Sequence, residues 1–365
     1  MKYFLIAGEA SGDKHAAALM EQIRQRDPQA QFVGLGGSQM AAAECRLYQD
    51  YSHMAFMGFA AVLANLGQVQ RNFRIAKEAL LSERPDVLVL VDYPSFNLRM
   101  AAFCRKHLPS VRIIYYIPPK VWAWKRRRIH RIAQLCDEIL GIFPFEPDFY
   151  AKYGYKCTYV GNPTAEQILN HQLSIHDHQS SVVLLPGSRE SEVHHCLLRM
   201  LEAARRCGNY RIVVCAAPGI DDTFYTPYLR AGETLTRETY TAVLQAKAAI
   251  VNSGTATLET ALLGTPQVAV YHLACSWFLK LVRWAQPFFF SIRHFTLVNI
   301  ISGKEVIREL LANDFTTEKV AAELQRLLTD EEYIKEMLAN YEHLRSLLGN
   351  QPAAANAADI ITSKR

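Results

Sequence analysis

The sequence predicts an α/β protein made of two doubly wound halves, each a parallel sheet with helices on both faces. Short apolar runs, such as VLVLV at 87–91 and VVLL at 182–185, alternate with helical segments along the chain, which is the pattern of such sheets. The 365 residues exceed the roughly 100–200 residues of one domain. The polar stretch at 170–181 interrupts the rhythm and is a candidate linker. We therefore predict a first domain over residues 1–168 and a second over 169–330.

The composition indicates a cytosolic globular protein. Hydrophobic residues make up 50% of the chain and charged residues 21%, so large cores can be buried. The eight cysteines form no C-x-x-C pair, and we expect reduced thiols rather than disulfides or a zinc site. The N-terminal apolar run is too short for a signal peptide, and no window approaches the ~20 apolar residues of a membrane span. The net charge of +5 is a mild excess, so charge clusters matter more than the total.

Two turns at strand ends in the first half are candidate sites. A strand over 2–7 ends in the glycine-rich turn GEASGD at 8–13, and a helix is predicted from about Lys14. Asp92 directly follows the buried strand VLVLV. Ligands of open α/β sheets bind at this carboxyl edge, where a partly desolvated carboxylate is a candidate general base. An N-cap for the next helix is an equally weighted alternative for Asp92.

Two further segments of the first half combine apolar or aromatic residues with basic ones. The apolar stretch MAFMGFAAVLAN at 54–65 precedes an amphipathic helix over 68–82 with cations on its polar face. It is either a core helix or an exposed helix that meets lipid. The segment 118–131 places two tryptophans beside six cations. An anionic substrate or membrane headgroups fit this better than nucleic acid, and a solvated helix face is the alternative.

The second half offers two turns suited to a diphosphate. Gly187, Ser188 and Arg189 follow the strand at 182–185 and supply backbone N–H groups, a hydroxyl and a guanidinium. Residues 248–266, AAIVNSGTATLETALLGTP, are predicted to form a strand, a phosphate-binding turn and a helix. Glu259, one turn into that helix, is placed to accept hydrogen bonds from ribose hydroxyls. An ordinary strand–helix connection with a surface charge is the alternative.

The remaining segments are aromatic or helical. Residues 277–295 mix aromatic side chains with cations, which fits core packing or a groove for an acyl chain or the membrane surface. We predict helices at 306–311 and 317–328, and a final long helix to about Leu348. The three histidines of the linker lack a carboxylate cluster, so no metal site is expected.

Phosphate donors on one half, with a carboxylate and a glycine turn on the other, describe a nucleotide-sugar glycosyltransferase. The sequence resembles the lipid-A-disaccharide synthase family along nearly its whole length. Seven matches in order carry the resemblance: residues 8–13 (GEASGD), 57–58 (MG), 92–97 (DYPSFN), 119–124 (PKVWAW), 185–189 (LPGSR), 253–259 (SGTATLE) and Asn299.

The resemblance implies a GT-B fold of two facing Rossmann-like domains with C-terminal helices. It also implies transfer of 2,3-diacylglucosamine from its UDP derivative to 2,3-diacylglucosamine 1-phosphate, giving the β-1,6-linked lipid A disaccharide 1-phosphate and UDP. Family members act in lipopolysaccharide biosynthesis as peripheral proteins on the cytoplasmic face of the inner membrane. They form homodimers that exchange C-terminal segments. Residues 331–365 are therefore expected to pack back on the first domain or to be swapped to a partner.

The resemblance also assigns roles by position. Asp92 would be the essential carboxylate and plausible base for the acceptor's 6-hydroxyl, with Glu9 and Ser11 beside it. The residues expected to bind UDP are Gly187, Ser188, Arg189, Ser253, Gly254, Thr255, Glu259 and Asn299. The expected acceptor, lipid or membrane contacts are Met57, Phe59, Val62, Leu63, Trp122, Trp124, Lys125 and Arg126. No cofactor or metal is expected, because Arg189 and helix N-termini can stabilise the departing diphosphate.

Two residues depart from the family pattern. Ser95 stands where many relatives carry a second Asp, and Asn162 stands where His is common, so neither receives a catalytic role. Three other functions remain as alternatives: a GT-B transferase acting on a lipid-linked peptidoglycan precursor, a UDP-sugar epimerase, and an inactive membrane-surface protein. The GEASGD and PKVWAW motifs fit the first poorly, the second needs catalytic carboxylates on both halves, and intact Asp92, Arg189 and Glu259 argue against the third.

Overall fold

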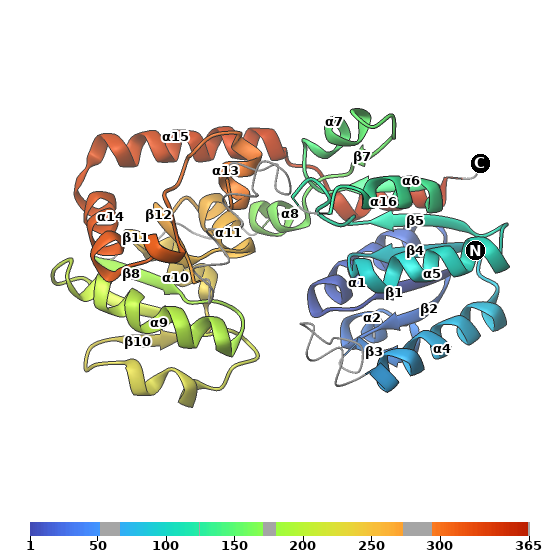
Figure 1. The fold of residues 1–365 in the computed structure, drawn as a ribbon, viewed down its shortest axis with the longest axis horizontal. Coiled ribbons are helices and arrows are strands. Elements are labelled where there is room, and N and C mark those ends of the chain that lie inside the picture. The colour runs from blue at the N-terminus through green and yellow to red at the C-terminus, as the bar shows by residue number, and fades with distance from the viewer. Residues whose placement is uncertain (52–65, 124, 171–179, 273–293, 364–365) are drawn as a thin grey trace. The chain divides into compact units, whose positions relative to one another are not determined.

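The computed structural model describes residues 1–51, 66–123, 125–170, 180–272 and 294–363, which form two compact units. The first unit comprises Met1–Glu166 and Gln351–Arg365, and the second comprises Gln167–Asn350 (Figure 1). Each unit is built on a parallel sheet, as the alternation of strands and helices predicts.

The first sheet has the strand order β3-β2-β1-β4-β5-β6-β7 within the described residues. Its strands are β1 (Lys2–Ala7), β2 (Gln31–Gly36), β3 (Arg46–Asp50), β4 (Val87–Val91), β5 (Arg112–Tyr116), β6 (Glu138–Gly141) and β7 (Thr158–Tyr159). The helices of this part of the chain are α1 (Ala10–Arg26), α2 (Ser38–Ala42), α4 (Leu66–Glu83), α5 (Pro94–His107), α6 (Arg128–Leu135), α7 (Glu146–Ala151), α8 (Pro163–Asn170) and α16 (Ala353–Thr362).

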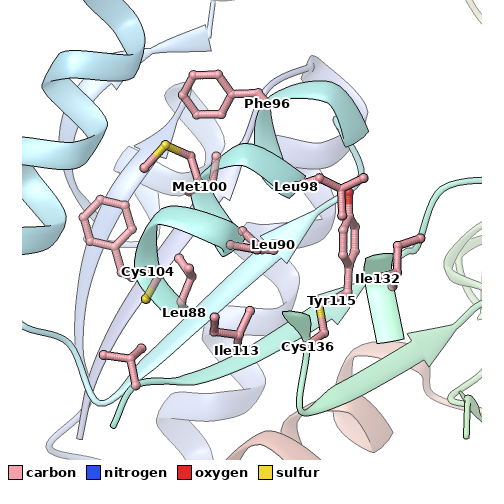
Figure 2. Close-up of a cluster of buried hydrophobic side chains, with 14 of the residues drawn as sticks. Leu88, Leu90, Phe96, Leu98, Met100, Cys104, Ile113, Tyr115, Ile132 and Cys136 are labelled. Carbon is pink, nitrogen blue, oxygen red and sulfur yellow. The ribbon is translucent and has the colours of Figure 1, made fainter. Parts of the chain in front are cut away.

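Both faces of this sheet are buried, which explains why its central strand is a continuous apolar run. Successive β4 residues alternate between two cores, because strand side chains have a period of two. Leu88 and Leu90 pack with α4, α5 and α6 on one face, and Figure 2 shows this core beneath α5. Val87, Val89 and Val91 pack on the other face with α1 and α16.

The second sheet has the order β10-β9-β8-β11-β12-β13 in the part of the chain that the structure describes. Its strands are β8 (Ser181–Leu185), β9 (Arg211–Cys215), β10 (Thr234–Thr236), β11 (Ala248–Asn252), β12 (Gln267–Tyr271) and β13 (Glu309–Leu311). The helices are α9 (Glu190–Arg205), α10 (Thr239–Gln245), α11 (Thr255–Leu263), α13 (Leu297–Ser302), α14 (Thr317–Thr329) and α15 (Glu331–Leu348), with short 3₁₀ turns η2 (Asp222–Phe224), η3 (Thr226–Tyr228) and η4 (Ala312–Asp314).

The prediction of a helix at 306–311 is wrong. Residues 309–311 form the edge strand β13, which pairs parallel to β12 with Ala269 opposite Glu309. The sequence VIRELL suits a helix locally, but pairing with the exposed edge of β12 decides the conformation.

The C-terminal residues 331–365 are divided between the two units. Helix α15 belongs to the second unit, where Arg345 donates to the carbonyl oxygen of Leu262 at the end of α11. Helix α16 returns to the first unit and packs on α1. There the Arg112 guanidinium donates to the carbonyl oxygens of Ile360 and Ile361, 2.9 and 3.0 Å away, and so caps the end of α16.

Candidate active site

The strand order of the first sheet reverses between β1 and β4, so the residues that follow these strands lie side by side. Ala7 pairs with Val91 at the carboxyl ends of the two strands, and Gly8 and Asp92 come next in the chain. Such a switch point is the usual ligand site of an open α/β sheet. The structure therefore brings the turn that contains Glu9 and the strand end that carries Asp92 to one edge.

The backbone at Asp92 is strained and held firmly. Asp92 and Tyr93 both have φ of 46°, a left-handed conformation that costs on the order of 1–3 kcal/mol per residue. The hydroxyl of Tyr115 and the amide of Asn97 each donate to the Asp92 carbonyl oxygen at 2.7 Å. The Asp92 N–H in turn donates to the carbonyl oxygen of Tyr116 at 3.3 Å. These bonds fix the direction in which Asp92 leaves the sheet.

The surroundings of the Asp92 carboxyl group perturb its pKa. Burial raises its pKa, and the nearby Lys120 ammonium and the Tyr93 N–H oppose that rise. The N-cap of α5 is Tyr93, which makes no side-chain capping bond. The structure thus gives no support to the N-cap alternative for Asp92. A desolvated carboxylate at a strained strand end is the setting expected of a general base.

Glycine at position 8 lets the Tyr93 ring cover the end of β1, because a Cβ atom there would overlap the ring carbons. Burial, followed by the charge of Glu9, raises the pKa of Tyr93, so Glu9 lies near the residue that follows Asp92. Helix α1 begins at Ala10 and not at the predicted Lys14. Ser11 is consequently an exposed residue of its first turn.

Two polar residues near these turns have structural roles. The buried Asp13 carboxylate accepts from the N–H groups of Gly37, Gln39 and Met40, at 2.7, 2.9 and 3.2 Å, and so caps α2. Asn162 is buried and its side-chain oxygen accepts from two N–H groups in the first turn of α8.

Most of the predicted lipid or membrane contacts are not placed by the structure. Met57, Phe59, Val62, Leu63 and Trp124 lie outside the described residues. Lys125 and Arg126 are exposed, as a surface contact requires.

The expectation is corrected for Trp122, which is only 6% exposed. Its indole N–H donates to the Glu146 carboxylate at 3.2 Å, and its ring meets the edges of Phe143 and Phe145. The residue therefore packs inside the first unit.

The second unit has an equivalent switch point between β8 and β11, where Leu185 pairs with Val251. The turn with Gly187, Ser188 and Arg189 follows β8, and the turn with Ser253 and Gly254 follows β11. The two predicted phosphate turns are therefore neighbours. Helices α9 and α11 begin at these turns without a side-chain N-cap from the described residues. Their first N–H groups can bind an anion.

The turn after β8 already holds a carboxylate. Glu192 accepts from the Ser188 N–H at 3.0 Å and from the Arg189 guanidinium at 2.9 Å. Gly187 has φ of 127°, and a Cβ atom there would lie 2.6 Å from a Glu192 carboxylate oxygen. Sequence reasoning missed Glu192, although its position three residues after Arg189 is typical of a residue that reaches back to a helix N-terminus.

Glu259 is half-buried on α11, in the turn that follows the predicted phosphate site. Burial, followed by the charge of Glu259, raises the pKa of Tyr240 to about 12. Tyr240 on α10 is therefore a second polar group near the predicted ribose contact. No motif in the sequence points to it, because only the packing of α10 against α11 brings it there.

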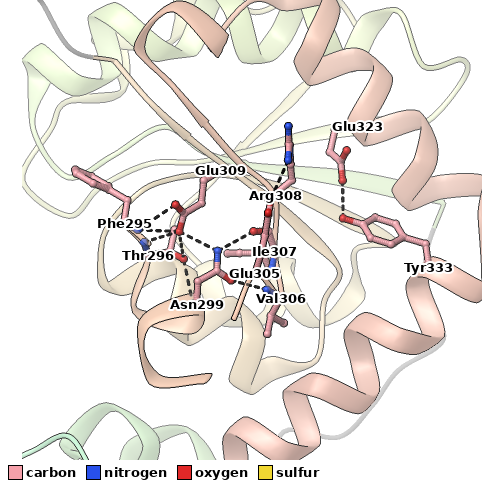
Figure 3. A network of polar contacts seen from close by, with 10 residues as sticks. All are labelled: Phe295, Thr296, Asn299, Glu305, Val306, Ile307, Arg308, Glu309, Glu323 and Tyr333. Atoms are coloured by element: carbon pink, nitrogen blue, oxygen red, sulfur yellow. Dashed lines mark hydrogen bonds and ion pairs between the residues drawn. The ribbon is translucent and has the colours of Figure 1, made fainter. Parts of the chain in front are cut away.

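Asn299 is fully buried, and its side chain is saturated by internal hydrogen bonds. Its amide group donates to the Ile307 carbonyl oxygen and to Glu309, both at 2.9 Å, and its oxygen accepts from the Val306 and Ile307 N–H groups at 2.8 and 3.0 Å (Figure 3). Direct contact with UDP would require breaking part of this network. The structure thus supplies a structural explanation for Asn299, while the UDP contact stays a prediction.

Within the described ranges, no group of three or more His, Cys, Asp or Glu side chains is arranged to hold a metal ion. Among the helices that the structure describes, none has the length and hydropathy to cross a membrane.

Comparison with known proteins identifies the family. Residues 3–362 match the family model described as lipid-A-disaccharide synthetase. The lipid-A-disaccharide synthase of Trichlorobacter lovleyi is 35% identical over 99% of this chain and 97% of its own length. The lipid-A-disaccharide synthase of Myxococcus xanthus is 35% identical over 99% of this chain and 96% of its own length.

The chain belongs to the lipid-A-disaccharide synthase family. The predicted family and its class, a glycosyltransferase enzyme, are confirmed. Among solved structures, a UDP-GlcNAc 2-epimerase from Methanocaldococcus jannaschii in complex with UDP-GlcNAc and UDP has a TM-score of 0.63 at 12% identity, covering 99% of both chains. The kitacinnamycin glycotransferase has a TM-score of 0.64 at 12% identity, covering 99% of this chain and 98% of its own. These likenesses confirm the GT-B fold of this lipid-A-disaccharide synthase family member.

Proposed function

We propose that the protein transfers 2,3-diacylglucosamine from its UDP derivative to 2,3-diacylglucosamine 1-phosphate. The products are the β-1,6-linked lipid A disaccharide 1-phosphate and UDP. Family membership over residues 3–362 is the observation that carries this proposal. The two sheet edges support it, because one offers a poised carboxylate and the other offers anion-binding helix N-termini.

In the proposed mechanism, the Asp92 carboxylate takes the proton of the acceptor's 6-hydroxyl. The hydroxyl oxygen then attacks the anomeric carbon of the donor sugar as the bond to the UDP oxygen breaks, which inverts the anomeric centre. Burial of Asp92 raises its pKa and so makes the carboxylate a stronger base than an exposed one. The Tyr93 ring packs against Gly8, and this contact keeps the residue next to the proposed base in place.

The departing UDP carries away negative charge, which the second unit is equipped to stabilise. We assign the diphosphate to the N–H groups at the starts of α9 and α11, with Ser188, Arg189, Ser253, Gly254 and Thr255. Arg189 can form charge-assisted bonds to phosphate oxygens once its pairing with Glu192 is exchanged. Glu259 is the proposed acceptor for the ribose hydroxyls. No metal is required in this scheme.

The decisive experiment follows disaccharide and UDP formation from the two acylated substrates. Asp92→Asn is expected to lower kcat by roughly 10²–10⁴-fold, the usual contribution of a general base. Asp148→Asn, which changes an exposed carboxylate on α7 of the same unit, is the matched control. A wild-type enzyme that forms no disaccharide but transfers sugar to a lipid-linked peptidoglycan precursor, or epimerises the UDP-sugar, would refute the proposed substrates. Unchanged turnover in Asp92→Asn would refute only the base.

We further propose that the enzyme works as a peripheral protein on the cytoplasmic face of the inner membrane. A groove of about 720 Å³ runs over α4, α5 and α6 of the first unit. The basic and aromatic residues that line it are Phe73, Arg74, Lys77, Arg99, Phe103 and Arg131. The Lys77 ammonium and the Arg99 guanidinium each lie 5.2 Å from a phenyl ring centre. Cations beside aromatic rings suit the anionic headgroup region of a bilayer.

Sedimentation with vesicles tests this surface. The wild-type protein should bind vesicles that contain phosphatidylglycerol, and the double variant Lys77→Glu, Arg131→Glu should lose most of that binding. Lys304→Glu with Lys335→Glu changes the net charge equally on exposed residues of the second unit. If both double variants lose binding equally, the groove is not the membrane contact.

A homodimer with exchanged C-terminal segments is the remaining family expectation that we propose for this chain. Helix α16 packs on α1, and a partner's α16 could occupy the same place if residues 349–352 extended. Light scattering of the full chain measures the mass. A cysteine pair across α1 and α16 would then show by cross-linking whether the contact joins one chain or two.

A further inference from the structure

Glu146 is a buried carboxylate at the catalytic edge of the first sheet that the mechanism above does not use. It follows β6 as the first residue of α7, and its side chain is only 1% exposed. One carboxylate oxygen accepts from the N–H groups of Ile142 and Phe143, at 2.8 and 3.0 Å. The other accepts from the Trp122 indole N–H at 3.2 Å. The carboxylate therefore joins the loop after β6 to the loop after β5.

The site is built to receive this carboxylate. At Gly141, the last residue of β6, a Cβ atom would lie 2.7 Å from a Glu146 oxygen and 2.9 Å from the Cys157 sulfur. Only glycine leaves room for the charged group there. The Trp122 ring, which binds the other Glu146 oxygen, forms T-shaped contacts with Phe143 and Phe145. The ring centres lie 5.7 and 5.1 Å away.

The loop that Glu146 holds also carries Lys120, whose positive charge lowers the pKa of Asp92. Residues 118–123 turn tightly, with the Val121 N–H donating to the Pro119 carbonyl oxygen at 2.6 Å and the Ala123 N–H to that of Lys120 at 3.0 Å. The Lys120 ammonium lowers the pKa of Asp92 and of Glu146 against the effect of burial. Lys120 thus lies within electrostatic reach of both carboxyl groups.

We propose that Glu146 is a positioning residue for the transfer reaction: by binding Trp122 and two backbone N–H groups, it fixes the 118–123 turn that presents Lys120 to Asp92. This inference rests on the proposed function, since it concerns the base of that reaction. Lys120 beside Asp92 favours the ionised carboxylate, which is the form that accepts a proton. Losing the anchor lets Lys120 move away, so a smaller fraction of Asp92 is ionised at a given pH.

Burial makes the charge of Glu146 sensitive to pH. Burial raises its pKa to about 7, against the lowering effects of the Phe143 N–H, Trp122, the Ile142 N–H and Lys120. The other titratable neighbours are Tyr150 on α7, Cys157 before β7 and Tyr159 on β7, whose own pKa values the charge of Glu146 raises in part. Because the Lys120 charge lowers the pKa of both Asp92 and Glu146, its removal should affect both carboxyl groups.

The test compares the pH dependence of kcat/KM in wild type, Glu146→Gln, Lys120→Met and the double variant. A glutamine has one acceptor oxygen, so it cannot serve both Trp122 and the two backbone N–H groups. Glu146→Gln and Lys120→Met should each move the acid limb to higher pH, by on the order of 1 unit. The double variant should move it no further than Lys120→Met alone. Glu21→Gln, an exposed change on α1, should leave the profile unchanged.

An acid limb that Glu146→Gln leaves in place, or shifts that add in the double variant, would overturn the proposal. If Glu146→Gln does not fold, Trp122→Phe replaces it, because this variant keeps an aromatic ring at the position while it removes the indole N–H together with one of the two fused rings. A spectrum of ¹⁵N-indole-labelled protein gives a readout that does not depend on turnover. The peak lost in Trp122→Phe must shift in Glu146→Gln, and a peak that stays in place overturns the anchor even where the wild-type enzyme shows no transfer activity.

Discussion

Replacing Asn299 with alanine separates a structural role for this residue from a role in binding UDP. The change removes four hydrogen bonds of the fully buried side chain. It leaves the N–H groups of Val306 and Ile307 without their acceptor. Each buried polar group left unpaired costs about 1–3 kcal/mol. Glu309 keeps its bonds from Phe295 and Thr296, so the cost comes mainly from the two N–H groups. We expect the free energy of unfolding to fall by on the order of 4 kcal/mol.

A loss of this size should be visible in the second unit of the full chain. The melting temperature of that unit should fall by roughly 10 °C, since 1 kcal/mol corresponds to about 2–4 °C for a domain of this size. Because a two-unit chain need not unfold in one step, amide hydrogen exchange over residues 295–311 should be followed beside circular dichroism. Exchange should accelerate there before it does in the first unit.

Asn299→Asp is the matched control. Its carboxylate can still accept from Val306 and Ile307, but it faces the Glu309 carboxylate and the Ile307 carbonyl oxygen. Its stability should therefore improve as the pH is lowered and the new carboxyl group is protonated. The structural explanation is wrong if Asn299→Ala melts within 1 °C of wild type while its affinity for UDP falls more than about tenfold.

Three further outcomes follow from the same contacts. Asp92→Asn should raise the melting temperature at pH 8 and not at pH 4, because burial raises the Asp92 pKa; the ionised carboxyl group therefore costs stability only as the pH rises through the folded-state pKa. Gly8→Ala should lower kcat by at least about tenfold with a smaller change in KM, since its methyl group must displace the Tyr93 ring beside the base. Glu192→Gln should tighten UDP binding, measured by calorimetry, by roughly 3–10-fold, because it frees Arg189 from an ion pair.

Each of these three has an outcome that contradicts it. A Gly8→Ala enzyme as active as Gly219→Ala, where a new Cβ atom meets nothing within 4 Å, would show that the Tyr93 ring does not matter. Weaker UDP binding by Glu192→Gln would mean that Glu192 shapes the turn and does not compete with phosphate. Equal melting temperatures of wild type and Asp92→Asn at pH 8 would show that the native Asp92 carboxylate is not desolvated.

The sequence was most informative where one local pattern determines a whole element. The apolar run at β4 predicts a strand buried on both faces, and Asp92 at its end follows directly. The turns at Gly187 and Gly254 are likewise predictable as strand–helix turns, because a glycine-containing polar segment follows an apolar run at each of them. That the two turns are neighbours depends on the strand order, and the strand order is a property of the whole sheet.

Long-range partners explain the predictions that failed. Helix α1 begins at Ala10, four residues before the predicted start, and its residue Asp13 caps α2 through Gly37, 24 residues away along the chain. No local signal reveals that long-range contact. Trp122 resembles a membrane residue by its cationic neighbours, yet Glu146 and two phenylalanines bury it. The strand β13 has the composition of a helix, and only the free edge of β12 gives it a partner.

The return of α16 to the first unit has a consequence for biosynthesis. A ribosome releases the first 166 residues long before it releases residue 353, so α1 waits with Ala16, Ala17 and Met20 uncovered while the second unit is being made. The first unit can complete its core only after residues 353–362 have been made. Nascent protein that stalls or is cleaved before Ala353 should therefore expose an apolar face of α1 to chaperones, whether or not the second unit has folded.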